Sequence, residues 1–339
     1  MMDLNLVDSY DYHLPPNLIA NAPLMPKESA RLLVYEREKN KISHLKFGDL
    51  AEILPPCEII FNDTKVIKAR IFGAKSSGGK IELLLNSPLN DNKFSAYIRG
   101  RVSVGSELVF DKNLRARVVE CCEDGLRVVE FSRDNRALGT HEIFALTDEI
   151  GHVPLPPYIK REDTKDDESW YQSIFAREAG AVAAPTASLH FSEEMLRALR
   201  ANHGIYYITL HVGAGTFKPV EARDLREHKM HSEFYSIAQD TAGILKSDKK
   251  ILGVGTTVTR TVENFARNGA KCGACELFLH PNNPPIRQNY LLTNFHLPKS
   301  TLIMLVASFI GLEKTLEIYR EAVEQKYRFY SYGDGMIIL

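Results

Sequence analysis

The segment EHKMHSEFY, residues 227–235, places five ionisable side chains within seven positions. Because imidazole titrates near neutral pH, His228 and His231 are candidates for proton transfer, and Glu233 could orient one of the rings. His211, which ends a predicted strand ahead of a small-residue loop, is a third candidate. The spacing does not match the HExxH zinc motif, so we expect no metal site. A solvated charged turn is the alternative interpretation.

A second group lies in GVGTTVTRTVEN, residues 253–264, where a predicted strand runs through glycines into a predicted helix. Free N–H groups at the start of such a helix attract anions, and Gly255 would let a ligand approach the backbone. Thr256 and Thr257 add hydroxyl donors, and Arg260 could bind a carboxylate or phosphate through two hydrogen bonds. The pattern is neither a Walker loop nor a full GxGxxG, so glycine required only for packing is the alternative.

Polar residues also precede a strongly apolar predicted helix in LLTNFHLPKSTL, residues 291–302. Asn294, His296 and Lys299 would lie where open α/β sheets bind ligands. A core histidine with satisfied hydrogen bonds is the alternative for His296. Asp334 follows an aromatic run whose rings could stack on bases or alternate within a buried strand.

Composition narrows the class of protein. The chain has 339 residues, a net charge of −1 and 44% hydrophobic residues, which is typical of a soluble globular protein with two domains. The N-terminus lacks the cationic start of a signal peptide, and the apolar run 302–311 is too short to cross a bilayer. Five sparse cysteines favour a reducing compartment, and the isolated Cys272-Gly-Ala-Cys275 pair is assigned no role. We expect a cytoplasmic protein with no membrane partner.

Basic residues concentrate between residues 64 and 120, which hold eleven Lys and Arg against five Asp and Glu. This local excess could contact RNA phosphates while the whole chain stays near neutral. Solvated outer faces of strands are the alternative explanation. The candidates for phosphate contact are Lys65, Lys68, Arg70, Arg99 and Arg101.

Two patterns of elements would position these residues. Between residues 64 and 131, six short strand-like runs follow one another without helices, which predicts an antiparallel sheet or small barrel. Elsewhere strands alternate with helices, which predicts an α/β domain. We expect helices at 191–204, 256–269, 298–311 and 312–327, and strands at 206–212, 249–255 and 275–280. The predicted architecture is an α/β domain with a mixed sheet, residues 1–63 and 152–339, carrying an inserted β domain, residues 64–151.

Long segments, in order along the chain, resemble the signature blocks of the S-adenosylmethionine:tRNA ribosyltransferase-isomerases. The resemblance covers essentially the whole sequence, with few departures, such as Val258-Thr259, Gly335 and the stretch 280–290. The matching blocks are YDYHLPPNLIANAPLMPKESARLLVY (10–35), FNDTKVIKARIFG (61–73), GHVPLPPYIKREDT (151–164), AREAGAVAAPTASLHFSEE (176–194), ITLHVGAGTFKPV (208–220), EHKMHSEFY (227–235), VGTTVTRTVE (254–263), LLTNFHLPKSTLIMLV (291–306) and YRFYSYGDGMII (327–338).

The resemblance implies an inserted six-stranded antiparallel β-barrel and a reaction that consumes S-adenosylmethionine as ribosyl donor. The acceptor would be tRNA with a GUN-type anticodon whose wobble base is 7-aminomethyl-7-deazaguanine. The products would be epoxyqueuosine-containing tRNA, adenine and methionine. S-adenosylmethionine is then a co-substrate, no other cofactor is expected, and the chain is expected to act as a monomer.

Such a reaction needs a base for the ribose 5′ carbon, an acid for the departing adenine, and several positioning donors. We assign proton transfer to His211, His228 and His231, with Glu233 orienting an imidazole. We expect the methionine carboxylate to be bound by Thr256, Thr257 and Arg260. The residues expected to line the ribosyl and base side are Asn294, His296, Lys299 and Asp334. One alternative is an RNA methyltransferase, which would release S-adenosylhomocysteine and no adenine. A non-catalytic RNA-binding protein, which would show no turnover, is the other.

Overall fold

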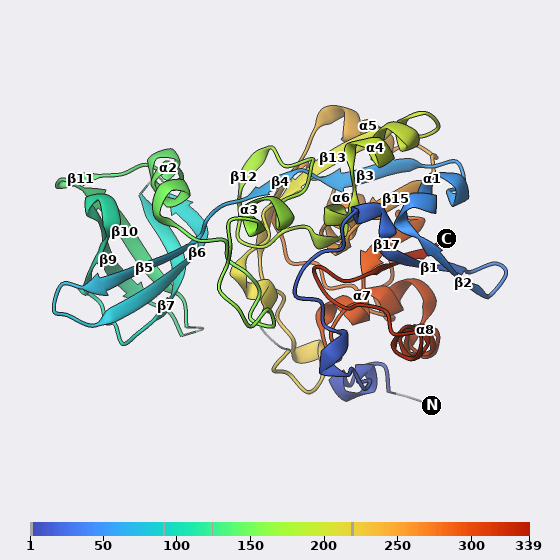
Figure 1. Cartoon of the computed structure of the whole chain (residues 1–339), viewed down its shortest axis with the longest axis horizontal. Coiled ribbons are helices and arrows are strands. Elements are labelled where there is room, and N and C mark those ends of the chain that lie inside the picture. The colour runs from blue at the N-terminus through green and yellow to red at the C-terminus, as the bar shows by residue number, and fades with distance from the viewer. Residues whose placement is uncertain (1–2, 91, 124, 218–219) are drawn as a thin grey trace.

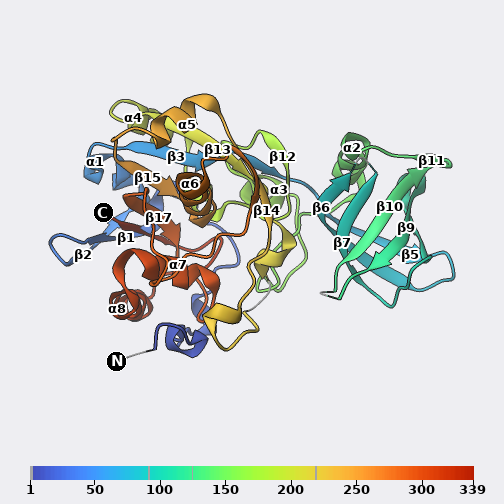
Figure 2. The same cartoon turned by 180° about the vertical axis from the view of Figure 1, so that it is seen from behind.

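The structure is a computed structural model that describes residues 3–90, 92–123, 125–217 and 220–339. Figures 1 and 2 show an α/β body, which holds both chain ends, and a β-barrel at the opposite end of the molecule. The chain leaves the body for the barrel once and returns once. This is the predicted architecture of an α/β domain with an inserted barrel.

In the described part of the chain, the body is built on a nine-stranded mixed sheet. The strands, in spatial order, are β16 (Cys272–Cys275), β14 (Glu233–Ile237), β13 (Ile205–Leu210), β3 (Glu58–Asn62), β15 (Ile251–Val254), β17 (Tyr290–Asn294), β18 (Gly335–Ile338), β1 (Arg31–Glu36) and β2 (Lys41–Lys46).

Four neighbouring strands at the centre of the sheet, β13, β3, β15 and β17, run parallel to one another. The residues of β3, β15 and β17 are almost entirely buried, as expected for parallel strands covered on both faces. The carboxyl ends of parallel strands meet at one edge of a sheet, where ligands of open α/β folds bind. Segments that follow β13, β15 and β17 therefore converge at this edge.

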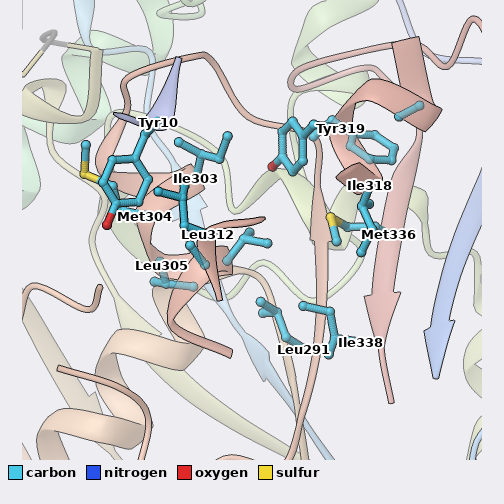
Figure 3. Packing of buried hydrophobic residues seen from close by; sticks show 14 of the residues in the cluster. Tyr10, Leu291, Ile303, Met304, Leu305, Leu312, Ile318, Tyr319, Met336 and Ile338 are labelled. Carbon is cyan, nitrogen blue, oxygen red and sulfur yellow. The ribbon is translucent and has the colours of Figure 1, made fainter. Parts of the chain in front are cut away.

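Helices cover both faces of the sheet. On one face, Leu252 and Leu292 pack in a cluster with residues of α1 (Leu50–Ile53) and α4 (Glu193–Arg200). On the other face, Ile60 packs with residues of α5 (Gln239–Leu245) and α6 (Thr256–Asn268). Leu291 on that same face packs with α7 (Thr301–Ile310) and α8 (Leu312–Glu324), and Figure 3 shows this cluster. α3 (Asp167–Trp170) lies in the loop region that returns from the barrel.

The predicted helices of the body are confirmed with their caps. The Ser192 hydroxyl accepts from the Met195 backbone N at the start of α4, and the Ser300 hydroxyl accepts from Ile303 N at the start of α7. Gly269 ends α6 in the left-handed conformation that favours glycine. Short 3-10 helices complete the set: η1 (Val7–Tyr10), η2 (Pro16–Leu18), η3 (Lys27–Ser29), η4 (Phe47–Asp49), η5 (Asp111–Asn113), η6 (Thr186–His190), η7 (Ala214–Phe217) and η8 (Leu225–Glu227).

The strand expected at 275–280 is wrong. The strand in this region is β16, which ends at Cys275 where the prediction began. Beyond it, Leu279 is buried in the core cluster of α7 and α8, so its apolar character reflects side-chain packing and not a strand ladder. The chain then turns tightly, with His280 and Asn283 exchanging backbone hydrogen bonds.

The barrel consists of six antiparallel strands, as the six sequence runs predict. Each strand pairs with two neighbours, and the pairings of β9 with β10 and of β5 with β8 close the ring. The strands are β5 (Arg70–Lys75), β6 (Lys80–Asn90), β7 (Lys93–Arg99), β8 (Glu107–Phe110), β9 (Leu114–Cys121) and β10 (Arg127–Arg133), with a two-residue extension β11 (Arg136–Ala137). α2 (Thr140–Ile150) buries Ile143 and Leu146 in the barrel core.

The two connections between body and barrel lie side by side. Arg70, at the start of β5, and His152, just after α2, pair as an isolated antiparallel bridge. A Cβ atom at Gly151 would lie 2.2 Å from the Lys68 carbonyl oxygen, so this crossing requires glycine. The preceding strand β4 (Thr64–Val66) pairs with β12 (Glu178–Ala181) of the body, so the barrel strands begin at Arg70 and not at residue 64. Among the described residues, no helix is long and apolar enough to cross a membrane.

Candidate active site

Two adjacent cavities lie at the carboxyl edge of the parallel strands, around the start of α6. The larger has a volume of about 630 Å³ and the smaller about 50 Å³, and they share Val212, Thr256 and Thr257 in their walls. The predicted body residues that line the larger cavity are Thr256, Thr257, Asn294, His296 and Lys299. Those that line the smaller cavity are His228, His231, Glu233, Thr256, Thr257 and Arg260. Predicted residues that are far apart in sequence are therefore brought together around these two cavities.

Part of the shared wall is the first turn of α6. Gly255 precedes it with φ of 92°, a conformation that favours glycine, and it has no side chain to cap the helix. The N–H groups of this first turn consequently keep their attraction for an anion. The Thr257 hydroxyl accepts from Asn62 Nδ2 at 3.2 Å, which ties the helix start to the end of β3.

The smaller cavity is organised by a buried ion pair. Arg260 and Glu233, with side chains 8% and 6% exposed, are in direct contact. Arg260 also donates to the carbonyls of Leu277 at 3.1 Å and Cys275 at 3.0 Å. The second Glu233 oxygen accepts from Gly213 N at 3.1 Å. Arg260 thus binds the protein itself, which does not favour the predicted contact with a methionine carboxylate. Glu233 holds Arg260 and the glycine loop together.

Two imidazoles, those of His228 and His231, line the smaller cavity together with this ion pair. The His231 ring lies against Gly215, where a Cβ atom would come within 2.6 Å of the ring. His228 contacts the Phe278 ring edge-on at a centroid distance of 5.4 Å. Burial, and secondarily the neighbouring His231, lower the pKa of His228 below its ordinary value. A neutral His228 can accept a proton at physiological pH.

The larger cavity is lined mainly by uncharged groups. Burial lowers the pKa of His296 to about 3, so its imidazole is neutral, and its Nε2 lies 2.9 Å from the Thr293 hydroxyl. Asn294 is 2% exposed and donates to the Tyr330 carbonyl at 2.9 Å. Lys299 is bound through Nζ to two N-terminal carboxylates, Asp8 at 2.9 Å and Asp11 at 3.1 Å.

The larger cavity also has an aromatic wall, in which Tyr330 belongs to the aromatic run noted in the sequence and Tyr158 was missed. Tyr158 and Tyr330 lie with ring centroids 3.9 Å apart and an interplanar angle of 31°. Tyr158 comes from the return of the barrel to the body, and its hydroxyl is bonded to Ser331. The segment VPLPPYI around Tyr158 belongs to a block that carries the family resemblance, and that signal could have drawn attention to this residue.

His211 and Asp334 lie outside both cavities. His211 Nδ1 bonds to the Thr64 hydroxyl at 2.8 Å, and burial lowers the pKa of its imidazole. Asp334 is 1% exposed and accepts from the backbone N–H groups of Arg31 at 2.9 Å and Arg328 at 2.8 Å. Asp334 therefore fixes the loop that carries Tyr330, and in this structure its oxygens face the protein.

The predicted RNA contacts fall in three places. Arg70 and Arg99 line a cavity of about 730 Å³ between barrel and body, where both approach Glu82 at 2.7 and 3.7 Å. Lys65 and Lys68 line a separate hollow in which Lys68 binds Glu168 at 2.9 Å. Arg101 is exposed on the loop after β7. Phe72, 48% exposed, is an additional aromatic on the same strand as Arg70, whose guanidinium lies 4.9 Å from its ring centroid.

No group of three or more His, Cys, Asp or Glu side chains in the described ranges is arranged to hold a metal ion. Cys272 is exposed and Cys275 buried at opposite ends of β16, and both are free thiols.

The chain matches a family model described as queuosine biosynthesis protein over residues 7–338. It belongs to this family. It is 64% identical to the S-adenosylmethionine:tRNA ribosyltransferase-isomerase of Campylobacter fetus subsp. fetus and 58% identical to that of Nitratiruptor sp., in each case over 100% of both chains. Among solved structures, it resembles the S-adenosylmethionine tRNA ribosyltransferase of Thermotoga maritima, with 32% identity, a TM-score of 0.54, and coverage of 98% of this chain and 100% of that one. The resemblance drawn from the sequence is confirmed, as is the fold that it implies.

Proposed function

We propose that the chain transfers and isomerises the ribosyl group of S-adenosylmethionine onto 7-aminomethyl-7-deazaguanine at the tRNA wobble position. The observation that carries this proposal is full-length family membership, with relatives of the named activity at 57–64% identity. The site is consistent with it, because the predicted histidines and polar residues gather around two adjacent cavities at the ligand-binding edge of the sheet. The enzyme releases adenine and methionine and leaves epoxyqueuosine in the tRNA.

The residues of the site divide into two roles in this proposal. The sulfonium acidifies the ribose 5′ carbon, and the neutral imidazole of His228, or the neighbouring His231 ring, accepts that proton. The departing adenine needs a proton or a hydrogen-bond donor in turn. Arg260 and Glu233 act as positioning residues that hold the glycine loop against α6, while Thr256 and Thr257 contact the substrate at the helix start.

His211, His296, Lys299 and Asp334 remain in the proposal with narrower parts. His211 is an alternative proton acceptor near the cavities. The neutral imidazole of His296 forms a hydrogen bond to the ribosyl part of the substrate. Lys299, at the edge of the larger cavity, holds the N-terminal segment in place through its ion pair with Asp8. Asp334 supports the Tyr330 loop from outside.

The decisive experiment mixes purified protein with S-adenosylmethionine and tRNA carrying 7-aminomethyl-7-deazaguanine. We expect one adenine to be released per modified tRNA, as measured by chromatography. The nucleoside digest of the same tRNA should contain a nucleoside with the mass of epoxyqueuosine. Release of S-adenosylhomocysteine without adenine would instead identify an RNA methyltransferase. Tight tRNA binding without either product would identify a non-catalytic RNA-binding protein.

Proton transfer is tested in the same assay. We expect His228→Ala and His231→Ala to lower kcat by about 10²-fold or more, the typical contribution of general acid–base catalysis. His203→Ala is a control, because that imidazole is buried against Cys57 and lies outside both cavities. Near-normal turnover in both active-site variants would remove these residues from the mechanism.

The tRNA is proposed to cross the cavity between barrel and body, with Arg70, Arg99 and Arg101 near phosphates and Phe72 near a base. Cationic side chains there and one exposed ring support this placement. Arg99→Glu with Arg101→Glu should weaken tRNA binding and reduce the slope of log affinity against log salt by about 1 per lost contact. Arg133→Glu, an exposed change on β10, is the control. An unchanged slope in the double variant would place the RNA elsewhere.

We further propose that the tRNAs carry GUN anticodons, that the enzyme acts as a cytoplasmic monomer, and that S-adenosylmethionine is its co-substrate with no additional cofactor. A monomer is supported by the origin of both cavity walls in one chain. Light scattering of the active protein and retention of activity after dialysis against EDTA test the oligomeric state and the metal requirement.

A further inference from the structure

Three buried polar atoms belong to side chains that line the larger cavity, yet have no hydrogen-bond partner among the described residues. They are Asn294 Oδ1 and the hydroxyls of Tyr171 and Tyr330, and two of these side chains are joined, because Asn294 donates to the Tyr330 carbonyl. Asn294 is 2% exposed and Tyr330 is 9% exposed. Among the described residues, neither Asn294 Oδ1 nor the Tyr330 hydroxyl has a hydrogen-bond partner. Buried polar groups are almost always hydrogen-bonded, because leaving one unpaired is costly. The cavity beside these side chains is where the missing partner can come from.

The orientation of the Asn294 amide is set by its neighbours. Nδ2 donates to the Tyr330 carbonyl at 2.9 Å and lies 3.2 Å from His190 Nε2. Burial lowers the pKa of His190 to about 3, so this ring is neutral and its Nε2 can accept. Rotating the amide by 180° would place Oδ1 against the Tyr330 carbonyl oxygen, bringing two acceptors together. Both amide hydrogens are therefore engaged, and the group that remains for a ligand is an acceptor.

Tyr330 is held in an unfavourable conformation. Its φ of 73° is a left-handed value that bulky side chains rarely adopt. Its carbonyl accepts from Asn294 Nδ2 and from Gly333 N at 2.9 Å, and its ring packs on Tyr158. Strain of this kind is maintained by surrounding structure and is concentrated at functional sites. Here the strained residue also has an unpaired hydroxyl.

The chemistry of the walls selects the ligand. The cavity carries aromatic rings, aliphatic side chains and threonine hydroxyls, and the Lys299 ammonium is bound to two carboxylates. An uncharged planar group suits such walls. Asn294 Oδ1 requires an N–H donor, and the Tyr330 hydroxyl can either donate or accept. A purine-type base offers both, because its exocyclic amine donates and an adjacent ring nitrogen accepts.

We infer that Asn294 and Tyr330 are specificity-determining residues that bind the amino edge of a purine-type base in the larger cavity. The inference rests on the proposed function, which brings two such bases to the site. One is the adenine of S-adenosylmethionine, and the other is the 7-deazaguanine of the tRNA. Both present an exocyclic amine, and the experiment separates them.

The test replaces Tyr330 by phenylalanine, which removes only the hydroxyl. Three quantities are measured: unfolding in urea without ligand, the Kd for S-adenosylmethionine by calorimetry, and the Kd for modified tRNA by filter binding. We expect Tyr330→Phe to unfold at the same or higher urea concentration, and to raise one of the two Kd values about tenfold. A weakened S-adenosylmethionine complex assigns the subsite to adenine, and a weakened tRNA complex assigns it to the deazaguanine.

Tyr332→Phe is the matched control. The Tyr332 hydroxyl donates to buried Asp167 at 3.1 Å and does not line the larger cavity. We expect this variant to unfold at lower urea concentration and to keep both Kd values. If Tyr330→Phe unfolds as early as the control, its hydroxyl has a structural partner such as bound water, and the inference is overturned. Two unchanged Kd values in Tyr330→Phe overturn it as well.

The acceptor role of Asn294 is tested with the ligand instead of the protein. The probe is S-adenosylmethionine in which the amine of the adenine is replaced by hydrogen, and the matching RNA probe lacks the 2-amino group of the deazaguanine. Wild-type protein should bind one of these probes about tenfold more weakly than its parent, and Asn294→Leu should lose that discrimination. Equal wild-type affinity for parent and probe in both pairs contradicts the assignment. If wild-type protein discriminates but forms no epoxyqueuosine, the proposed function fails while the subsite stands.

Discussion

The smaller cavity contains a buried ion pair whose two side chains bind each other, whereas the larger cavity is lined mainly by uncharged groups, three of which have a polar atom without a partner among the described residues. In the smaller cavity, Arg260 has the Glu233 carboxylate and two carbonyls as partners. In the larger cavity, Asn294 and Tyr330 each keep one free polar atom. The comparison indicates that the charged residues most visible in the sequence form the framework of the site, and that uncharged residues are left to contact the ligand.

The largest expected effect comes from breaking the framework of the smaller cavity. Glu233→Ala leaves a buried guanidinium without its anion, which typically costs about 3–5 kcal/mol of stability. Urea unfolding monitored by circular dichroism measures the loss. Glu142→Ala, which removes the exposed partner of Arg136, is the control and should cost far less. Equal losses in the two variants would show that the inner ion pair is not a framework.

The neutral character of the larger cavity is tested by pH. The pKa of His296 is lowered to about 3 in the folded chain from 6.5, so between these values only the unfolded chain binds the proton. Stability is therefore complete above pH 6.5 and is lost as the pH falls toward 3, by about 1.4 kcal/mol per pH unit. His296→Gln removes this contribution, so wild-type protein should lose about 2 kcal/mol more than the variant between pH 6.5 and 5.

Urea unfolding at several pH values makes this measurement. His141→Gln, at an exposed position of α2, is expected to keep the wild-type pH dependence. Parallel stability curves for wild type and His296→Gln would mean that the imidazole in the larger cavity is charged or solvated.

A smaller effect would show whether the barrel also supports the framework. Asn86 of β6 accepts from Ala214 N at 2.9 Å, next to Gly213, whose N–H binds Glu233. Asn86→Ala removes this hydrogen bond together with the Asn86 Nδ2 bond to Ser95 within the barrel at 3.0 Å. Loss of the contact with Ala214, about 1 kcal/mol, should lower kcat/KM for tRNA about fivefold in the adenine-release assay. Ser87→Ala is the control, because the Ser87 hydroxyl bonds to Ser95 and Asn86 within the barrel, and its loss leaves the Asn86 bond to Ala214 in place. If both variants behave alike, the glycine loop is positioned by the body alone.

The fold was predictable where its signals are local. The barrel strands follow from runs of alternating residues between turns, and α4 and α7 follow from serine caps before apolar residues. The strand expected at 275–280 failed, because Leu279 is apolar for packing beneath α7 and α8, and periodicity does not separate that cause from strand pairing.

The sequence predicts many of the residues that gather at the candidate site, but not what each of them binds. The segments that follow parallel strands converge, so grouping His231, Thr256 and Asn294 needed only the strand order. That Arg260 would bind Glu233 depends on β14 lying beside α6, a tertiary contact without a sequence signature. The position of Tyr330 at the cavity could not be predicted, because nothing in the sequence distinguishes it from the other aromatic residues of the same run.

The bridge between Arg70 and His152 has a consequence for folding. β3 must find β13 across the long stretch of chain that contains the barrel, and the entropy of closing a loop grows with its length. The barrel is built from pairings of strands that are near in sequence, and such contacts form early. Once the barrel has closed, Arg70 and His152 are neighbours, so the intervening residues no longer count towards the loop that β3 and β13 must close. The insertion thereby shortens the search for the central parallel pair of the body.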